Sequence, residues 1–198
     1  LVEIFDSTIG AGTVLMPLGG AYQLTPAESM AAKIPVLEGE TTTAMLMSYG
    51  YNPAIGRWSP FHGALYAIVE AVARIAASGG DYRRIRLSLQ EYFERLGEDP
   101  AKWGKPFAAL LGAYYAQKEL GIPAVGGKDS MSGSFEELNV PPTVVAVAVC
   151  PADVRRVLSP EFKAANSHVV FLPLRRVEGE VPDFRQLSAN YGRLYELA

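Results

Sequence analysis

The stretch Ile122-Pro-Ala-Val-Gly-Gly-Lys-Asp-Ser-Met-Ser-Gly133 joins a short apolar segment to glycine, serine and charged residues. The apolar part, 122–125, is typical of a short strand, and the glycines indicate a loop that leaves it. Glycine lets backbone N–H groups approach an anion closely, and Lys128 supplies a point charge. The adjacent carboxylate and hydroxyls can order a hydrated metal ion or a ribose. The residues predicted to contact the phosphate of a nucleotide or substrate are Gly126, Gly127, Lys128, Asp129, Ser130 and Ser132.

The spacing of this loop matches neither of two standard nucleotide motifs. A Walker A loop needs Gly, four residues and then Gly-Lys-Ser/Thr, and a dinucleotide fingerprint needs spaced glycines. A strand-to-strand turn that carries a solvated Lys-Asp pair therefore stays open as the alternative. Because such a pair adds little stability on a surface, its place between Gly-Gly and Ser-x-Ser favours contact with a ligand.

Three further segments indicate strands. Residues 41–51 form a β-branched and apolar run that ends at Asn52-Pro53. Residues 84–89 alternate polar and apolar side chains, as in a half-exposed strand. Residues 143–149 are a continuous Val/Ala run, which is typical of a strand buried on both faces.

Two helices are expected between these strands. Ser59-Pro60 is typical of a helix start, and Gly79-Gly80 is typical of a helix end. Asp99-Pro100 indicates the start of a second helix. Because Pro106 interrupts its pattern, we expect the main body of this helix to begin near Lys105.

The alternation of strands with helices predicts an α+β fold with α/β-type alternation. Residues 1–36, rich in Gly, Pro and small side chains, are expected to form an extended leading segment. Residues 37–158 are expected to form the main domain. Residues 159–198 are expected to be a linker and the truncated start of a following domain, with a strand at 168–172 and a helix at 183–197.

The composition narrows the class of protein. The chain has 198 residues, of which 49% are hydrophobic and 20% charged, enough for one sizeable core. Its net charge of −3 gives no basic footprint for nucleic acid or an anionic membrane, and no apolar run nears the roughly 18 residues of a spanning helix. The single cysteine, Cys150, cannot form an internal disulfide and suits a reducing compartment, so we expect a cytoplasmic protein. We expect the Cys150 thiol itself to be structural. Leu1 in place of an initiator Met indicates a piece of a longer protein.

The motif at 125–132, with Asp81–Ser88 and Pro141–Val145, resembles phosphoribosylformylglycinamidine synthase, the large ATP-dependent amidotransferase of purine biosynthesis. Phe5–Gly10 resembles the segment that enters the second of that enzyme's two repeated synthetase halves. Ser159–Phe162 resembles the passage into the next domain of the same half. The resemblance covers essentially the whole chain, and it implies that the chain is a fragment of this longer enzyme.

The resemblance also implies a fold and partners. Residues 37–158 match the amino-terminal domain of an aminoimidazole-ribonucleotide-synthetase-like half, with a four-stranded-type sheet covered by two helices. In the family this sheet pairs with that of the other half in a pseudo-dimeric barrel, so the fragment is expected to self-associate through its sheet. The other implied partners are the remaining domains, including the glutaminase domain.

The implied reaction converts formylglycinamide ribonucleotide into formylglycinamidine ribonucleotide, with ATP and glutamine-derived ammonia. The implied cofactors are ATP or ADP and Mg²⁺. No catalytic residue is expected in this chain, because Cys150, His62 and His168 match no glutaminase motif. The whole enzyme is thus a carbon–nitrogen ligase, and the isolated chain is expected to be inactive.

The family's second half carries an auxiliary nucleotide–magnesium site, and the matching metal positions are Glu28 and Glu70. Four residues after Glu70, where the family has Asn, this chain has Arg74, which cannot ligate a metal. The bland alternative is a solvated helix face with a Glu-to-Arg pair, and a turn carboxylate at Glu28. A non-catalytic scaffold domain with a decayed nucleotide site is therefore the alternative function.

Overall fold

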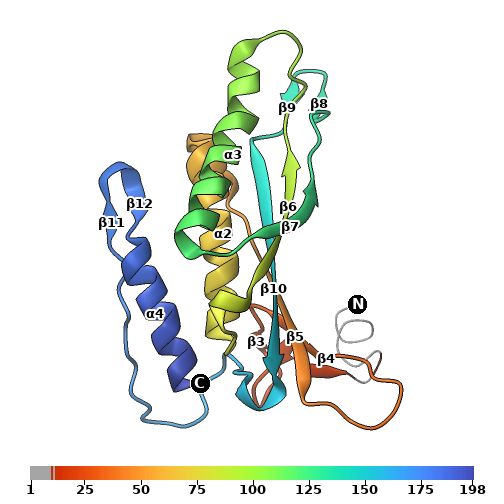
Figure 1. Cartoon of the computed structure of the whole chain (residues 1–198), viewed down its shortest axis with the longest axis vertical. Helices are drawn as coiled ribbons and strands as arrows, with labels where there is room; N and C mark the ends of the chain where they lie inside the picture. The colour runs from red at the N-terminus through yellow and green to blue at the C-terminus, as the bar shows by residue number, and fades with distance from the viewer. Residues whose placement is uncertain (1–9, 11) are drawn as a thin grey trace. The chain divides into compact units, whose positions relative to one another are not determined.

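The chain alternates strands and helices in a computed structural model that describes residues 10 and 12–198 (Figure 1). The helices are α1 (Pro53–Trp58), α2 (Pro60–Ala77), α3 (Pro100–Leu120) and α4 (Phe184–Leu197). The strands are β1 (Thr13–Leu15), β2 (Leu18–Gly19), β3 (Thr25–Pro26), β4 (Met30–Lys33), β5 (Thr43–Gly50), β6 (Arg86–Tyr92), β7 (Ala124–Lys128), β8 (Ser134–Phe135), β9 (Leu138–Asn139), β10 (Thr143–Asp153), β11 (Arg176–Val177) and β12 (Val181–Pro182). The predicted α+β fold is confirmed.

Six strands form one sheet in the order β1-β4-β5-β10-β6-β7. β4 and β5 pair antiparallel, whereas β6 and β7 pair parallel. Four of the five predicted strands are β5, β10, β6 and β7 of this sheet. β1 and β4 come from the leading segment 1–36 and extend the sheet from the four strands expected to six. The pairs β2-β3, β8-β9 and β11-β12 form separate two-stranded sheets.

The chain divides into two compact units. The first unit contains the residues up to Ser48, with 74–84 and 149–198. The second unit contains 49–73 and 85–148. The boundaries predicted from the sequence, at residues 36 and 158, stay a prediction.

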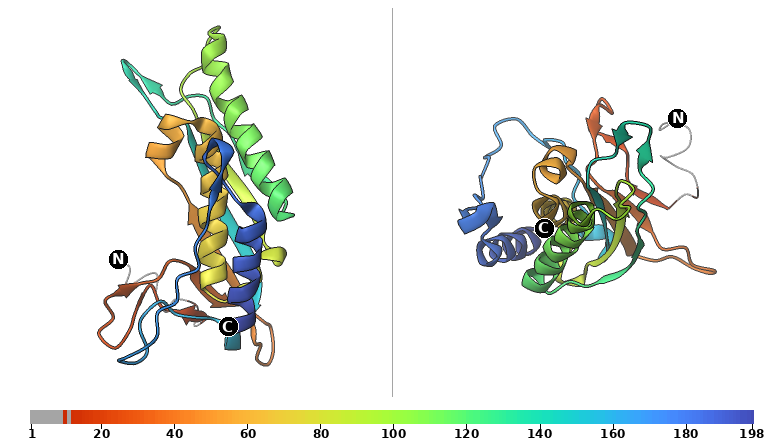
Figure 2. Two further views of the ribbon diagram at one scale, coloured as in Figure 1. Left: turned by 90° about the vertical axis from the view of Figure 1, so that its left-hand side faces the viewer. Right: turned by 90° about the horizontal axis from the view of Figure 1, so that it is seen from above.

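In the second unit, α2 and α3 cover one face of the strands (Figures 1 and 2). Burial alternates along β10, with Val144, Ala146 and Ala148 buried and the intervening residues half-exposed. The prediction that this strand is buried on both faces is wrong, because the helices cover only one of them. The packing beneath the helices is close: a Cβ at Gly112 of α3 would lie 2.0 Å from the Phe61 carbonyl oxygen.

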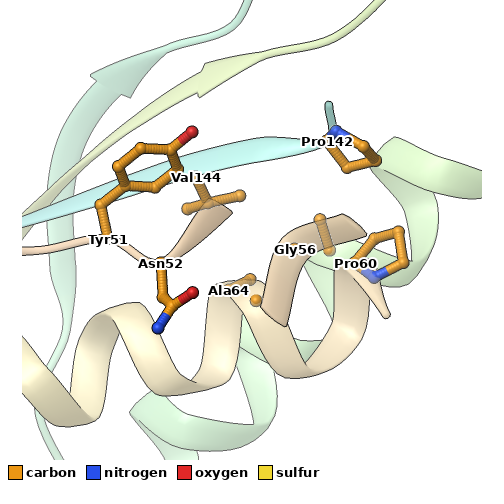
Figure 3. Close-up of a pocket in the computed structure, with 9 residues that line it drawn as sticks. Tyr51, Asn52, Gly56, Pro60, Ala64, Pro142 and Val144 are labelled. Atoms are coloured by element: carbon orange, nitrogen blue, oxygen red, sulfur yellow. The ribbon is translucent and has the colours of Figure 1, made fainter. Parts of the chain in front are cut away.

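A small pocket lies where α1 and α2 meet the start of β10 (Figure 3). It has no room for a water molecule, and it is lined mainly by apolar residues. Its polar groups are engaged within the unit, because Asn52 Oδ1 caps α1 by accepting from Ala54 N–H (3.0 Å) and the Tyr51 hydroxyl lies 3.4 Å from that of Thr143. Helix α1 was not predicted, since Asn52-Pro53 also ends a strand.

Helix α3 begins at Pro100, so the prediction that its body begins near Lys105 is wrong. Asp99 caps the helix by accepting from Ala101 N–H at 2.9 Å. Lys102 and Lys105 both pair with the buried carboxylate of Glu94, at 3.3 Å for Lys102. The cap and the two ion pairs hold the first turns helical, and they offset the backbone hydrogen bond that Pro106 cannot donate.

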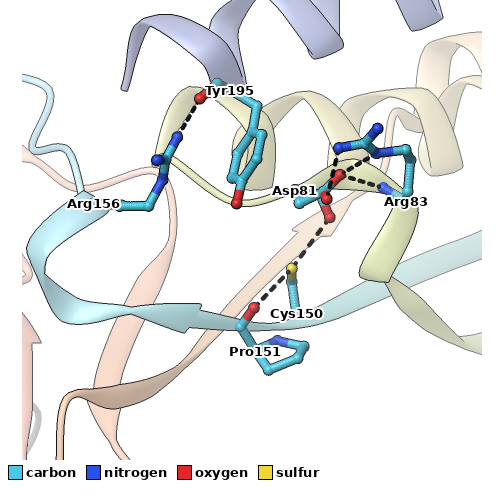
Figure 4. Close-up of polar contacts among 6 residues, drawn as sticks. All are labelled: Asp81, Arg83, Cys150, Pro151, Arg156 and Tyr195. Carbon is cyan, nitrogen blue, oxygen red and sulfur yellow. Dashed lines mark hydrogen bonds and ion pairs between the residues drawn. The ribbon is translucent and has the colours of Figure 1, made fainter.

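In the first unit, helix α4 lies at the predicted position, and Asp183 caps it by accepting from Gln186 N–H. Tyr191 is buried, with its ring 5.6 Å from that of Tyr82. The Arg156 guanidinium lies over the Tyr195 ring and donates to the Tyr195 carbonyl oxygen (Figure 4). The carboxy-terminal segment therefore packs within this unit, and its assignment to a following domain stays a prediction.

Two further sequence predictions in the first unit have different outcomes. Cys150 is buried, and its Sγ donates to the Asp81 carbonyl oxygen at 3.4 Å (Figure 4). Burial raises the pKa of this thiol to about 11, as suits a structural cysteine. The strand predicted at 168–172 is wrong: Val169 to Phe171 are exposed and non-repetitive, because the part of the chain described here offers them no strand to pair with. No helix among residues 10 and 12–198 is long and apolar enough to cross a bilayer.

Gly127 of β7 provides a test of the sheet edge. Its φ is +152°, and a Cβ there would lie 2.0 Å from the Leu89 carbonyl oxygen. We expect Gly127→Ala to lower the free energy of unfolding by roughly 2 kcal/mol or more, measured by urea denaturation. The matched control is Gly126→Ala, since nothing lies within 4 Å of a Cβ at that position. Equal stability of the two variants would contradict the observed pairing of β7.

Candidate functional site

The stretch predicted to bind phosphate lies at the edge of the sheet in the second unit. β7 continues through Lys128, so Gly126, Gly127 and Lys128 belong to a strand and not to the loop expected from their composition. Gly127 pairs with Leu89, and Lys128 pairs with Gln90 of β6. Glycine at 127 is what lets the two strands approach, because any side chain there meets the backbone of β6.

The two charges of the motif have different neighbours. The Lys128 ammonium lies 6.0 Å from the centre of the Tyr92 ring. Asp129, the first residue after β7, is close enough to Glu91 to influence the ionisation of that carboxyl.

A groove of about 510 Å³ lies on the side of β7 that faces α3. Its α3 wall is apolar and aromatic, and its other wall is the backbone of β7. The lining residues are Leu89, Glu91, Trp103, Pro106, Phe107, Leu110, Gly126, Gly127, Lys128, Asp129 and Met131. The charged residues in this lining are Glu91, Lys128 and Asp129, which bring two carboxylates and one ammonium group.

Glu91 has an unusual environment in this groove. Burial raises the pKa of its carboxyl, and the nearby negative charge of Asp129 raises it further. Glu91 was not among the predicted site residues, because the predicted strand ended at Leu89. The polar–apolar alternation of that strand, carried two residues further, would have put Glu91 on the same face as Leu89.

The loop after β7 is held by backbone hydrogen bonds to the end of β6. Ser130 N–H donates to the Glu91 carbonyl at 3.1 Å, and Gly133 N–H donates to the Phe93 carbonyl at 2.9 Å. The hydroxyls of Ser130 and Ser132 lie 2.8 Å apart and bond to one another. These two N–H groups already have acceptors, so an anion at this loop would rely on the Lys128 ammonium and the serine hydroxyls.

A second hollow of about 450 Å³ lies beside this loop. Its lining includes Tyr92, the ring beneath the Lys128 ammonium, and Ser132 from the predicted set. The paired residues Phe135 and Leu138 at the tip of the β8-β9 sheet also line it. This hollow therefore offers serine hydroxyls and aromatic surface together.

The predicted metal positions have protein partners. In the first unit, Glu28 Oε2 lies 3.1 Å from Arg74 Nε, and the adjacent Ser29 hydroxyl lies 2.5 Å from that of Ser78. In the second unit, Glu70 Oε2 accepts from Tyr51 N–H at 2.9 Å. The chain, as far as the structure describes it, contains no group of three or more His, Cys, Asp or Glu side chains placed to hold a metal ion. The sequence carried no signal that Arg74 would pair with Glu28, which precedes it by 46 residues.

Comparison with known proteins gives one relative by sequence. No protein-family model matches the chain. The chain is 27% identical over 149 residues to the phosphoribosylformylglycinamidine synthase subunit PurL of Pyrobaculum aerophilum. The match covers 75% of this chain and 20% of the relative.

Solved structures share the fold. PurL of Thermotoga maritima complexed with FGAR matches with a TM-score of 0.70 and 14% identity, over 98% of this chain and 28% of that one. The same protein complexed with ATP matches with a TM-score of 0.62 and 18% identity, over 80% and 24% of the two chains. The resemblance drawn from the sequence is confirmed, and the chain spans less than a third of the length of these relatives.

The coupling of Glu91 to Asp129 can be tested by titration. We expect Asp129→Asn to lower the pKa of Glu91 and to leave it above its ordinary value, since burial remains. Carbon-13 NMR of the Glu91 carboxyl measures this pKa, with Glu98→Gln as the control.

A raised pKa of Glu91 means that the folded chain holds this proton more tightly than the unfolded chain. The stability that Glu91 contributes is therefore complete below the unfolded pKa and is lost as the pH rises through the folded pKa. Glu91→Gln should remove that pH dependence, and an unchanged titration in Asp129→Asn would contradict the coupling.

Proposed function

We propose that this chain, which resembles phosphoribosylformylglycinamidine synthase in sequence and fold, forms part of an enzyme with that activity in purine biosynthesis. The observation that carries the proposal is the agreement in fold over 98% of the chain with a PurL complexed with FGAR. In the proposed reaction, ATP activates the amide oxygen of formylglycinamide ribonucleotide, and ammonia derived from glutamine displaces the phosphate. Since the relatives are several times longer, other domains, including the glutaminase, would supply the rest, and a cytoplasmic location stays a prediction.

Within this reaction, the proposed role of the β7 edge is to bind phosphate through Lys128. The Lys128 ammonium rests on the Tyr92 ring and has no ion-pair partner among the described residues. An ammonium without an ion-pair partner is available for a charge-assisted hydrogen bond to a phosphate of ATP, ADP or substrate. Gly126, Gly127, Asp129, Ser130 and Ser132 complete the proposed contact set.

Magnesium does not fit the residues proposed to hold it. Glu28 is neutralised by Arg74, and one oxygen of Glu70 accepts a backbone N–H. The guanidinium supplies beside Glu28 the positive charge that a metal ion would otherwise bring. This observation favours the second candidate function, in which the chain is a scaffold domain with a decayed nucleotide site that supports a catalytic half elsewhere in the enzyme.

The two functions differ in the expected effect of Lys128→Ala. If Lys128 binds phosphate, this change should weaken the binding of nucleotide or substrate roughly tenfold or more, because it removes a charge-assisted contact of about 1.5–3 kcal/mol. Calorimetry with ADP, ATP and formylglycinamide ribonucleotide on the assembled enzyme measures it. The matched control is Lys118→Ala, since Lys118 likewise lies over a ring, that of Tyr114, at 5.9 Å. If Lys128→Ala leaves the affinities and kinetic constants unchanged, the phosphate contact is contradicted and the scaffold function is favoured.

The proposed enzyme also requires a partner for the uncovered face of the sheet. Val145 and Val147 are half-exposed on the face opposite the buried residues of β10. We expect the isolated chain to self-associate through this face and to form no amidine product. Sedimentation at high micromolar concentration tests the association. Val147→Lys should shift the chain toward monomer, whereas Glu119→Lys on exposed α3 should not, and a strictly monomeric wild type would contradict the expectation.

A further inference from the structure

Helix α3 carries an apolar stripe that its own unit does not cover. Trp103, Phe107 and Leu110 are 56%, 63% and 55% exposed. Their spacing of four and three residues puts them on one side of the helix, and all three line the groove beside β7. A contiguous exposed patch of large apolar side chains marks a binding surface on a globular protein.

The opposite wall of this groove is the edge of a sheet. β7 is the last strand in the order of the described sheet, so its outer backbone groups are not paired by another strand of that sheet. A Cβ at Gly126 would find nothing within 4 Å, so the backbone is accessible at this point. An edge of this kind binds an extended peptide by adding it as a further strand.

The charged residues at one end of the groove favour a particular type of side chain on a bound segment. Glu91 is half-buried and Asp129 lies beside it, and neither carboxylate has an ion-pair partner among the described residues. Lys128 also lines the groove, and its ammonium lies 6.0 Å from the centre of the Tyr92 ring, so the two carboxylates leave a net negative charge there. The aromatic wall and the carboxylates together suit a basic side chain, whose methylene stem packs on apolar surface while its charge meets a carboxylate.

We propose that this groove binds an extended polypeptide segment, which adds beside β7 and places an arginine or lysine side chain between the α3 stripe and the carboxylates of Glu91 and Asp129. The edge strand and the length of the stripe favour a peptide over a free small amine. The groove lies on the α3 side of β7, whereas the proposed phosphate contact involves Lys128 turned onto Tyr92. Gly126, Gly127, Lys128 and Asp129 belong both to this groove and to the proposed phosphate contacts, so ADP binding is measured separately from peptide binding.

The test uses the peptide acetyl-Val-Val-Arg-Val-Val-amide and a second peptide in which neutral citrulline replaces arginine. Binding to the purified chain is followed by calorimetry and by Trp103 fluorescence in a Trp58→Phe background. We expect the arginine peptide to bind roughly tenfold more tightly than the citrulline peptide, because the carboxylates face its charge. Methylation of the peptide's backbone nitrogens should also weaken binding, because it removes the donors for strand addition.

Variants separate the parts of this proposal. Glu91→Gln combined with Asp129→Asn should abolish the preference for arginine, whereas the control Glu98→Gln should retain it. The single variant Glu91→Gln should reduce the preference and leave the binding of ADP unchanged, so failure here is distinct from failure of the phosphate site. Equal binding of the two peptides, a preference that survives in the double variant with native circular dichroism, or full binding of the methylated peptide would each overturn the proposal.

Discussion

The close pairing of β7 with β6 at Gly127 is the constraint on which both candidate surfaces depend. The backbone of residue 127 approaches the Leu89 carbonyl so closely that no side chain fits between them. This approach continues β7 as far as Lys128 and ties the following loop to the end of β6 through Ser130. The positions of Lys128 and Asp129 follow from it, because Lys128 is the last residue of β7 and Asp129 begins the loop after it.

Ion pairs stabilise the start of α3. The buried carboxylate of Glu94 binds Lys102 and Lys105, which stand on either side of Trp103. The hydrogen bond from Lys105 is the main reason that the pKa of Glu94 lies below its usual range, so the ion pairs persist at neutral pH. They keep the helix regular up to Pro106, and the wall of the groove is thereby fixed before any ligand arrives.

The charges of the chain also explain why a nucleotide contact is proposed here without a metal ion. A carboxylate that already faces a guanidinium, as Glu28 faces Arg74, gains little from a cation and would have to release its partner to bind one. Lys128 is in the opposite situation, since its ammonium lies over the Tyr92 ring and has no ion-pair partner among the described residues. The proposed phosphate contact and the proposed peptide groove are thus two uses of one sheet edge, one through a cation and one through carboxylates.

The type and order of the main elements follow from local sequence patterns. The β-branched runs at 41–51 and 143–149 became β5 and β10, and Asp99, Asp183 and Gly121 cap their helices as their chemistry requires. The motif at 125–132, with Asp81–Ser88 and Pro141–Val145, also identified the resemblance that the comparisons confirmed. These features depend on neighbours within a few residues, so local propensity and capping decide them.

The pairing of charged side chains depends on the tertiary structure. Arg74 pairs with Glu28 across 46 residues, and Asp129 lies beside Glu91 because β6 and β7 are parallel neighbours in register. The absence of a strand at 168–172 has the same origin, since β-branched residues form a strand only where another strand offers hydrogen bonds. Such contacts depend on the positions of segments far apart in the chain, and hydrophobic periodicity carries no information about which distant segment will supply the partner.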